Sequence, residues 1–226
     1  MSKSRTLPSR QRENVIRAYR SRGKSNQQLW LVYSLKTNRD WILDSDRHLA
    51  HWILFLETNP DVRTFNLDLD DAPIVSSGTE QGPDFDAAVE LTSGGSEYHR
   101  LLLGASEEEG CAHADVLDNS GRTTVRTFVE ADLSTRGQEA MRWLKVLAYC
   151  AGIRDEQQSA ASQAAMTVMR GLDHGTIRDV TESMRDFDLQ IALGVISRMA
   201  VLGDIALDLF SSGFTLSSPW VWRAAP

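Results

Sequence analysis

The 226-residue sequence has little cysteine and no long hydrophobic run. Its two cysteines, Cys111 and Cys150, are too few for a disulfide framework, and no C-x-x-C pair is present. Without a stretch of about 18 apolar residues, no membrane span is expected. The N-terminus is basic and carries no apolar segment, which is not the pattern of a secretory signal. These absences predict a cytoplasmic protein with reduced thiols and no membrane partner.

Several enzyme motifs are also missing from the sequence. It contains no phosphate-binding loop, nucleophile elbow, H-E-x-x-H pair or dinucleotide fingerprint. His48 and His51 are three residues apart and could be combined with Cys111 and His113 in a zinc site. That spacing matches no finger or ribbon pattern, so two ordinary helix histidines are the better interpretation.

The net charge of −7 is distributed unevenly. Residues 1–24 hold eight basic residues and one acid, Glu13, and so carry about +7 against about −14 for the remainder. A basic arm on an acidic body suggests a segment that binds DNA phosphates. The alternative is a solvated tail that aids solubility. The candidate DNA-binding residues are Arg10, Arg12, Arg17, Arg20, Arg22 and Lys24.

The region after this arm alternates between strand and helix patterns. β-branched, aromatic and alternating runs predict strands at 29–35, 62–69, 84–91, 97–103 and 125–133. Asp44-Ser45-Asp46 supplies an N-cap for an amphipathic helix over 46–57. Residues 107–121 are polar and ambiguous, and Ser134 is the expected cap of the next helix.

The C-terminal part predicts three helices followed by a short hairpin. The first helix ends near Arg170, Thr176 caps the second, and Asp188 caps the third, which ends at Gly203. The hairpin is expected from 204–210 and 214–217. Helix–turn–helix followed by a hairpin is the pattern of a winged helix.

Three stretches carry a resemblance to a known family. They are YSLKTNRDWILDSDRHLAHWILFLETNPDV (33–62), GPDF (82–85) and a segment from VRTFVEADL to RWLKVLAYC (125–150). In this order they resemble TnsA, the endonuclease subunit of heteromeric bacterial transposases. The resemblance implies a basic arm over 1–25, an α/β restriction-endonuclease-like domain of the PD-(D/E)xK type over 26–152, and a C-terminal winged-helix domain over 165–226.

The resemblance implies a magnesium site for DNA cleavage, and this sequence matches it only in part. The family uses a helix Glu and a strand Asp to hold Mg²⁺, with a Lys on the following strand. The strand Asp corresponds to Asp84. The helix Glu position is occupied by His48, or by Leu49 if the helix is shifted by one residue, and the lysine strand offers Arg100 near Leu102. We therefore expect a degenerate site that needs no cofactor, or Mg²⁺ bound through Asp84 if the protein is active. By strand alternation, Asp86 is expected on the face opposite Asp84.

The resemblance also implies partners, a DDE-type transposase or an AAA+ ATPase. The expected recognition helix, 188–201, has Arg198 as its one basic residue, which favours a protein surface over DNA. Trp220 and Trp222 are candidate partner anchors, with packing as the alternative. The sequence thus predicts a DNA- and partner-binding transposition subunit; the alternatives are an active endonuclease and a winged-helix DNA-binding regulator.

Overall fold

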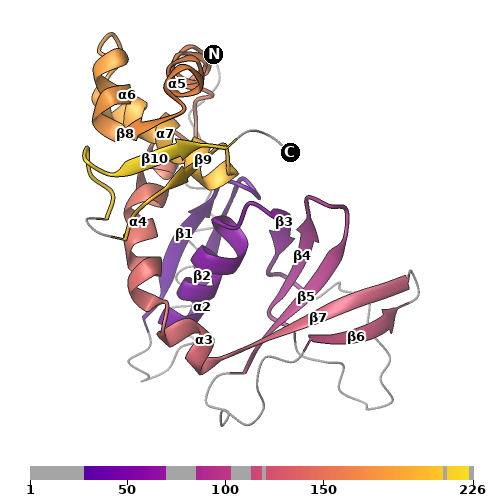
Figure 1. Ribbon diagram of the computed structural model, residues 1–226. Helices are drawn as coiled ribbons and strands as arrows, with labels where there is room; N and C mark the ends of the chain where they lie inside the picture. Colours follow the sequence, from indigo (N-terminus) through magenta and orange to yellow (C-terminus); the bar gives the residue numbers. More distant parts are fainter. Residues whose placement is uncertain (1–27, 70–84, 103–112, 119–120, 211–212, 224–226) are drawn as a thin grey trace, which may run out of the picture.

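The computed structural model describes residues 28–69, 85–102, 113–118, 121–210 and 213–223 (Figure 1). The first half contains β1 (Trp30–Ser34), β2 (Arg39–Leu43), α2 (Asp46–His51), the π-helix η1 (Trp52–Glu57), β3 (Val62–Asn66), β4 (Ala87–Leu91), β5 (Ser96–Leu102), β6 (His113–Asp118) and β7 (Gly121–Val129). The second half contains α3 (Glu130–Ser134), α4 (Gly137–Gly152), α5 (Ser159–Leu172), β8 (His174–Thr176), α6 (Ile177–Ser183), α7 (Leu189–Leu202), β9 (Ile205–Leu207) and β10 (Pro219–Trp222).

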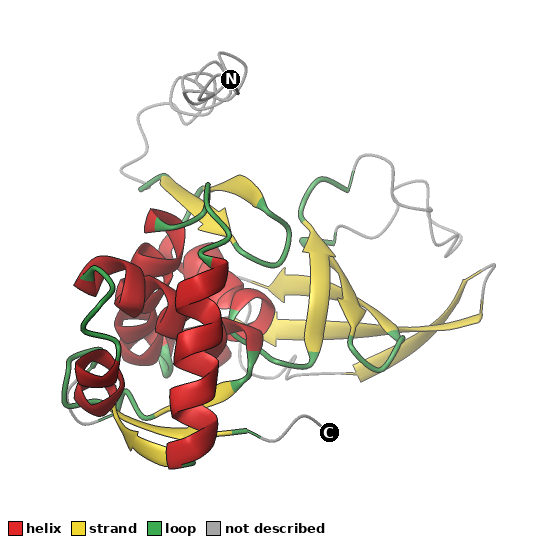
Figure 2. Ribbon diagram, turned by 90° about the horizontal axis from the view of Figure 1, so that it is seen from above, coloured by secondary structure: helices red, strands yellow, loops and turns green. Residues whose placement is uncertain are grey.

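A five-stranded mixed sheet forms the centre of the first half, with the strand order β3-β4-β5-β7-β6. Neighbouring strands are antiparallel except β5 and β7, which are parallel. β1 and β2 form a separate antiparallel hairpin. The expected mixed α/β class is therefore confirmed, and Figure 2 shows the helices gathered on one side while the sheet extends away from them.

The helical segment 46–57 forms where the sequence predicts it. The Ser45 side chain accepts a hydrogen bond from the His48 amide, which caps the first turn. Its apolar stripe, which includes Trp52, Ile53 and Leu56, is buried against the sheet and α4. The last two turns continue as the π-helix η1, a form that is common at functional positions.

A buried carboxylate ties the end of η1 to the β1–β2 turn. Glu57 is fully buried and accepts hydrogen bonds from Ser34 Oγ at 2.7 Å and from the Leu35 amide at 2.6 Å. Lys36 donates from Nζ to the carbonyls of Leu56 and Asn59, and burial lowers its pKa to about 8. Burial also raises the pKa of Glu57. The two charged side chains thus hold the helix end on the hairpin.

Two expectations between residues 107 and 137 need correction. The ambiguous segment contains β6, and the strand expected over 125–133 ends at Val129. The Val129 amide donates to the Asp132 carboxylate, 2.9 Å away, and this contact starts the short helix α3. Ser134 is the last residue of α3 and does not cap α4, which begins after Arg136.

The C-terminal helices agree with their predicted caps. Thr176 and Asp179 satisfy each other's backbone amides at the start of α6, and Asp188 caps α7 through the Gln190 amide. Gly203 ends α7 with a φ of 88°, a conformation suited to glycine.

The expected hairpin over 204–210 and 214–217 is wrong in its second strand. That strand is β10, at Pro219–Trp222, and it lies between β8 and β9. Residues before it form a turn, in which Ser218 Oγ accepts from the Thr215 amide and donates to the Gly213 carbonyl. The polar residues at 215–218 are therefore used for turn formation.

α4 connects the two halves of the described chain (Figure 1). Ile153, at its end, packs so closely on α7 that a Cβ atom added at Gly194 would lie 2.8 Å from Ile153 Cγ2. Arg154 pairs with Asp40 of β2 at 2.9 Å. One hydrophobic core includes residues from both halves. Within the described residues, no helix has the length and apolarity needed to cross a membrane.

Candidate functional site

A cleft of about 320 Å³ lies where α2 faces the residues that enter β4. Its polar side chains come from three places: the end of β2, α2 and the bend before β4. The lining residues include Asp44, His48, His51, Trp52, Phe85 and Asp86. The cleft therefore contains His48, the helix residue that was expected from the sequence at a degenerate metal-ligand position.

His48 lies between two carboxylates. Its Nδ1 atom is 2.7 Å from Asp44 Oδ1 and 2.8 Å from Ser45 Oγ. Its Nε2 atom is 3.4 Å from Asp86 Oδ1. The hydrogen bond that His48 donates to Asp86 raises the pKa of His48, with a further contribution from Asp44, although burial acts in the opposite direction. This arrangement favours the imidazolium form, in which both ring nitrogens donate.

Asp86 is held in place by the backbone of β5. Its Oδ2 atom accepts a hydrogen bond from the Leu101 amide at 2.7 Å, and its own amide donates to the His99 carbonyl at 2.8 Å. Strand alternation predicts that Asp86 lies on the face of the sheet opposite Asp84. However, β4 begins only at Ala87. Asp86 lies in a bend before the strand, so its direction follows from the bend and not from the two-residue period.

Two buried histidines lie behind the cleft wall. His51 Nε2 is 3.0 Å from His99 Nδ1, and His99 Nε2 is 3.3 Å from Glu97 Oε2. Burial lowers the pKa of His51 well below its usual value, and it lowers the pKa of His99 to about 4 despite the opposing effect of Glu97. Both imidazoles are therefore neutral near pH 7, and they form a hydrogen-bonded chain from Glu97 to the cleft.

Arg100, the expected substitute for the family's lysine, is not among the residues that line the cleft. Its guanidinium lies 5.5 Å from the ring centroid of Phe85. His99 is buried against His51 and Phe128, so alternation along β5 directs Arg100 to the other face. Leu102 ends β5 and offers no polar group.

Other predicted site residues lie outside the described part of the chain. Asp84 is one of them, as are Asp70, Asp71, Cys111 and the arm with Arg10, Arg12, Arg17, Arg20, Arg22 and Lys24. The zinc grouping with Cys111 and His113, the less favoured alternative, is therefore not tested by the described residues.

The described residues do not fit Mg²⁺. Among them, no group of three or more His, Cys, Asp or Glu side chains is arranged to hold a metal ion. Asp86 directs one oxygen to the Leu101 amide and the other to an imidazole. Mg²⁺ prefers several oxygen ligands in octahedral geometry, whereas imidazole suits zinc and copper.

Trp220, proposed as a partner anchor, is buried in the C-terminal core. It is 1% exposed, and its Nε1 atom donates to the Thr176 carbonyl at 2.9 Å. The anchor interpretation is wrong for this residue, and packing, the alternative, holds. Trp222 is half-buried beneath the Arg170 guanidinium, which lies 5.2 Å from its ring centroid.

The third predicted helix, α7, is also largely buried. Nine of its fourteen residues are buried, and the guanidinium of Arg198 is used within the protein. It donates to the carbonyls of Ile153, Glu156 and Gln157 at 3.1, 3.3 and 3.0 Å. The one basic side chain of this helix therefore stabilises the α4–α5 connection.

Of the three residues that pair in the cleft, His48 was predicted from the sequence as a site residue, whereas Asp44 and Asp86 were not. Asp44 was assigned to helix capping, and the spacing of four residues to His48 was the signal that could have revealed the pair. Asp86 required knowledge of where β4 begins. Comparison with protein-family models and with curated proteins finds no match for this chain.

Proposed function

We propose that this chain is a TnsA-like transposition subunit whose nuclease-like site is degenerate, and that it binds DNA and a transposition partner during assembly. The observation that supports this most directly is the contact between His48 and Asp86. In the resemblance, a helix side chain and a strand carboxylate face each other across a metal ion. Here His48, at the helix position, pairs directly with Asp86, two residues after the Asp84 position, and an imidazolium neutralises that carboxylate.

The order of elements agrees with the nuclease part of the proposal. A helix, α2 with η1, precedes the mixed sheet, and the helix α4 follows it. Asp86 lies in the bend just before β4, the second sheet strand in chain order, which pairs with β5. The family's metal-binding Asp corresponds to Asp84, two residues earlier in the chain, and the fold-level analogy remains an analogy.

The C-terminal elements agree with the winged-helix part. Helix α5, strand β8, helices α6 and α7, and strands β9 and β10 follow one another, and β10 lies between β8 and β9. A winged helix has this order of helices and strands. The buried α7 and the internal use of Arg198 favour a protein-binding role over DNA reading, which speaks against the regulator alternative.

The test is metal-dependent cleavage of DNA by the full chain. Supercoiled plasmid is incubated with the protein and Mg²⁺ or Mn²⁺, with Asp84→Ala and Asp86→Ala variants as controls. We expect no nicking above the background shared by all three proteins. Nicking that either substitution abolishes would establish the endonuclease alternative in place of this proposal.

Assembly is tested separately with a DDE-type transposase or an AAA+ ATPase, taken from the neighbouring genes if one is encoded there. We expect the full chain to join a complex of that protein with a DNA end, as seen by a further gel shift. A complex that forms identically without the chain, together with no direct binding to that protein, would contradict the assembly role.

A further inference from the structure

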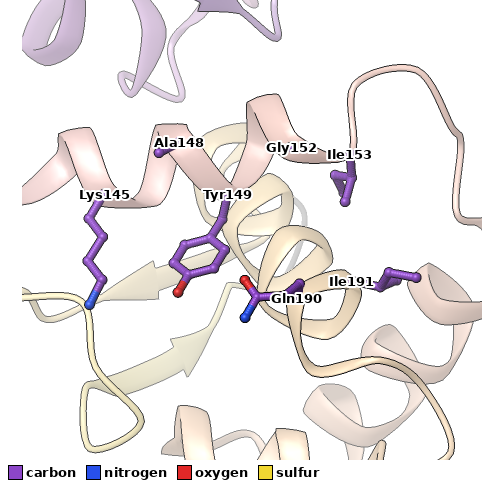
Figure 3. Close-up of a pocket in the computed structure, with 7 residues that line it drawn as sticks. All are labelled: Lys145, Ala148, Tyr149, Gly152, Ile153, Gln190 and Ile191. Atoms are coloured by element: carbon purple, nitrogen blue, oxygen red, sulfur yellow. The ribbon is translucent and has the colours of Figure 1, made fainter.

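A second cavity, which shares no lining residue with the His48 cleft, lies between α4 and the first turn of α7 (Figure 3). It has a volume of about 470 Å³ and is lined by Lys145, Ala148, Tyr149, Gly152, Ile153, Gln190 and Ile191. The residues from α4 recur at helical spacing, so they form one face of that helix. We call this cavity the α4–α7 pocket.

Two glycines explain why the pocket exists. At Gly194 the two helices touch, since an added Cβ atom would meet Ile153 at 2.8 Å. At Gly152 an added Cβ atom would meet nothing within 4 Å. The helices are therefore closely packed at one point and leave open space beside Gly152.

The pocket has one polar and one apolar end. Lys145, Tyr149 and Gln190 bring their polar atoms close together below α4, whereas Ile153 and Ile191 lie at the opposite end (Figure 3). Lys145 Nζ uses one donor on the Phe214 carbonyl, at 2.8 Å, and an ammonium has three donors. Within the described residues, the Tyr149 hydroxyl and the Gln190 carboxamide have no hydrogen-bond partner. The polar end thus offers donors and one positive charge.

Exposed apolar side chains occur on the same two helices and the adjoining loop. Met141 is 58% exposed and lies one helical turn before Lys145. Leu189, next to Gln190, is 47% exposed. Phe210 is 81% exposed and contacts the Arg142 guanidinium of α4, 5.3 Å from its ring centroid. Exposed apolar groups around a concave site are typical of protein-binding surfaces.

We infer that the α4–α7 pocket binds an acidic, amphipathic segment of a partner protein. An apolar side chain of that segment enters the end formed by Ile153 and Ile191. A carboxylate one turn away binds Lys145, Tyr149 and Gln190. The inference rests on the partner-binding part of the proposed function and gives it a location and a chemistry.

Charge selects this occupant over the alternatives. The basic arm of this chain, with a charge of about +7, would be repelled by Lys145 and brings no carboxylate cluster. Duplex DNA, an extended row of phosphates, would find only one lysine in a pocket whose other end is apolar. A carboxylate with a neighbouring apolar side chain matches both ends.

The test uses a phage-displayed library of random 12-residue peptides selected on the immobilised full chain. Gly152→Leu fills the pocket and serves for counter-selection. Gly171→Leu is the matched control, since Gly171 is a helical glycine of α5 with nothing within 4 Å of an added Cβ atom. Both substitutions should strengthen their helices, so neither threatens folding.

We expect selected peptides to carry Asp or Glu within four positions of a large apolar residue. A synthetic consensus peptide, followed by fluorescence anisotropy, should bind at least about tenfold more weakly to Gly152→Leu and to Lys145→Ala, and equally to Gly171→Leu. Selection of no peptides, or of basic peptides, would overturn the inference, as would equal binding by Gly152→Leu. Self-association of the chain that Gly152→Leu abolishes would identify a second copy as the occupant and also overturn it. No DNA or transposase is needed, so failure here is distinguishable from failure of the proposed function.

Discussion

The Nε2 atom of His48 lies 3.4 Å from Asp86 Oδ1, while its Nδ1 atom lies 2.7 Å from Asp44 Oδ1. One imidazole thus bridges the end of β2 and the start of β4. Because both contacts improve when the ring is protonated, the bridge links the stability of this cleft to pH.

Asp86→Asn should lower the pKa of His48, measured by NMR titration of its ring protons. The folded-state pKa is raised above the ordinary value of 6.5, so the stabilisation is complete below that value and is lost as pH rises through the folded pKa. The substitution should therefore cost about 1–2 kcal/mol of unfolding free energy near pH 5.5 and less near pH 8. Asp68→Asn, in the exposed pair with Arg39, is the control. An unchanged His48 pKa in Asp86→Asn would contradict this prediction.

Glu57→Ala should destabilise the protein by about 3 kcal/mol, measured by urea unfolding. It leaves the backbone amides of Leu35 and Lys36 and the buried Ser34 hydroxyl without the carboxylate that accepts their hydrogen bonds. Glu57→Gln keeps one oxygen acceptor and should cost less. Glu90→Ala, at an exposed position of β4, should stay within about 0.5 kcal/mol. A Glu57→Ala variant as stable as Glu90→Ala would show that the network contributes little.

Gly194→Ala and Gly152→Ala should have opposite effects on thermal stability. The added methyl at Gly194 overlaps Ile153 and should cost about 1–3 kcal/mol. The methyl at Gly152 enters open space in a helix and should add up to about 1 kcal/mol. Equal melting temperatures for the two variants would refute the close contact between α4 and α7.

Deletion of residues 1–24 should weaken binding of all duplex DNA sequences to a similar degree. Eight basic residues can neutralise several phosphates, and each contributes about one unit to the slope of log affinity against log salt concentration. The slope, measured by anisotropy at several salt concentrations, should therefore become flatter. Identical slopes for both proteins would assign the arm to solubility alone.

Local signals predicted the helix starts well. Ser45, Thr176 and Asp188 each cap a helix as expected, because a cap depends on residues within three positions of it. Strands that depend on distant partners were harder to predict. β10 was misplaced because its position is fixed by pairing with β8 and β9, more than a dozen residues away.

One residue of the cleft, His48, could be predicted from the sequence, whereas its partners Asp44 and Asp86 could not. The resemblance described under Sequence analysis singled out His48, whereas the bend that turns Asp86 toward it is set by hydrogen bonds to the backbone of β5. The α4–α7 pocket could not be predicted either. It depends on the separation of two helices at Gly152, and no local sequence pattern encodes that separation.

The contact of Ile153 with Gly194 has a consequence for the ancestry of such chains. A recombination event that joined the first half of one chain to the second half of another would bring together an α4 end and an α7 that had changed independently. A larger residue at either position would collide, and a smaller one at Ile153 would leave a cavity. Hybrid chains should therefore fold mainly when the crossover lies before α4, so that both positions are inherited together. We expect α4 and α7 to be inherited as one unit.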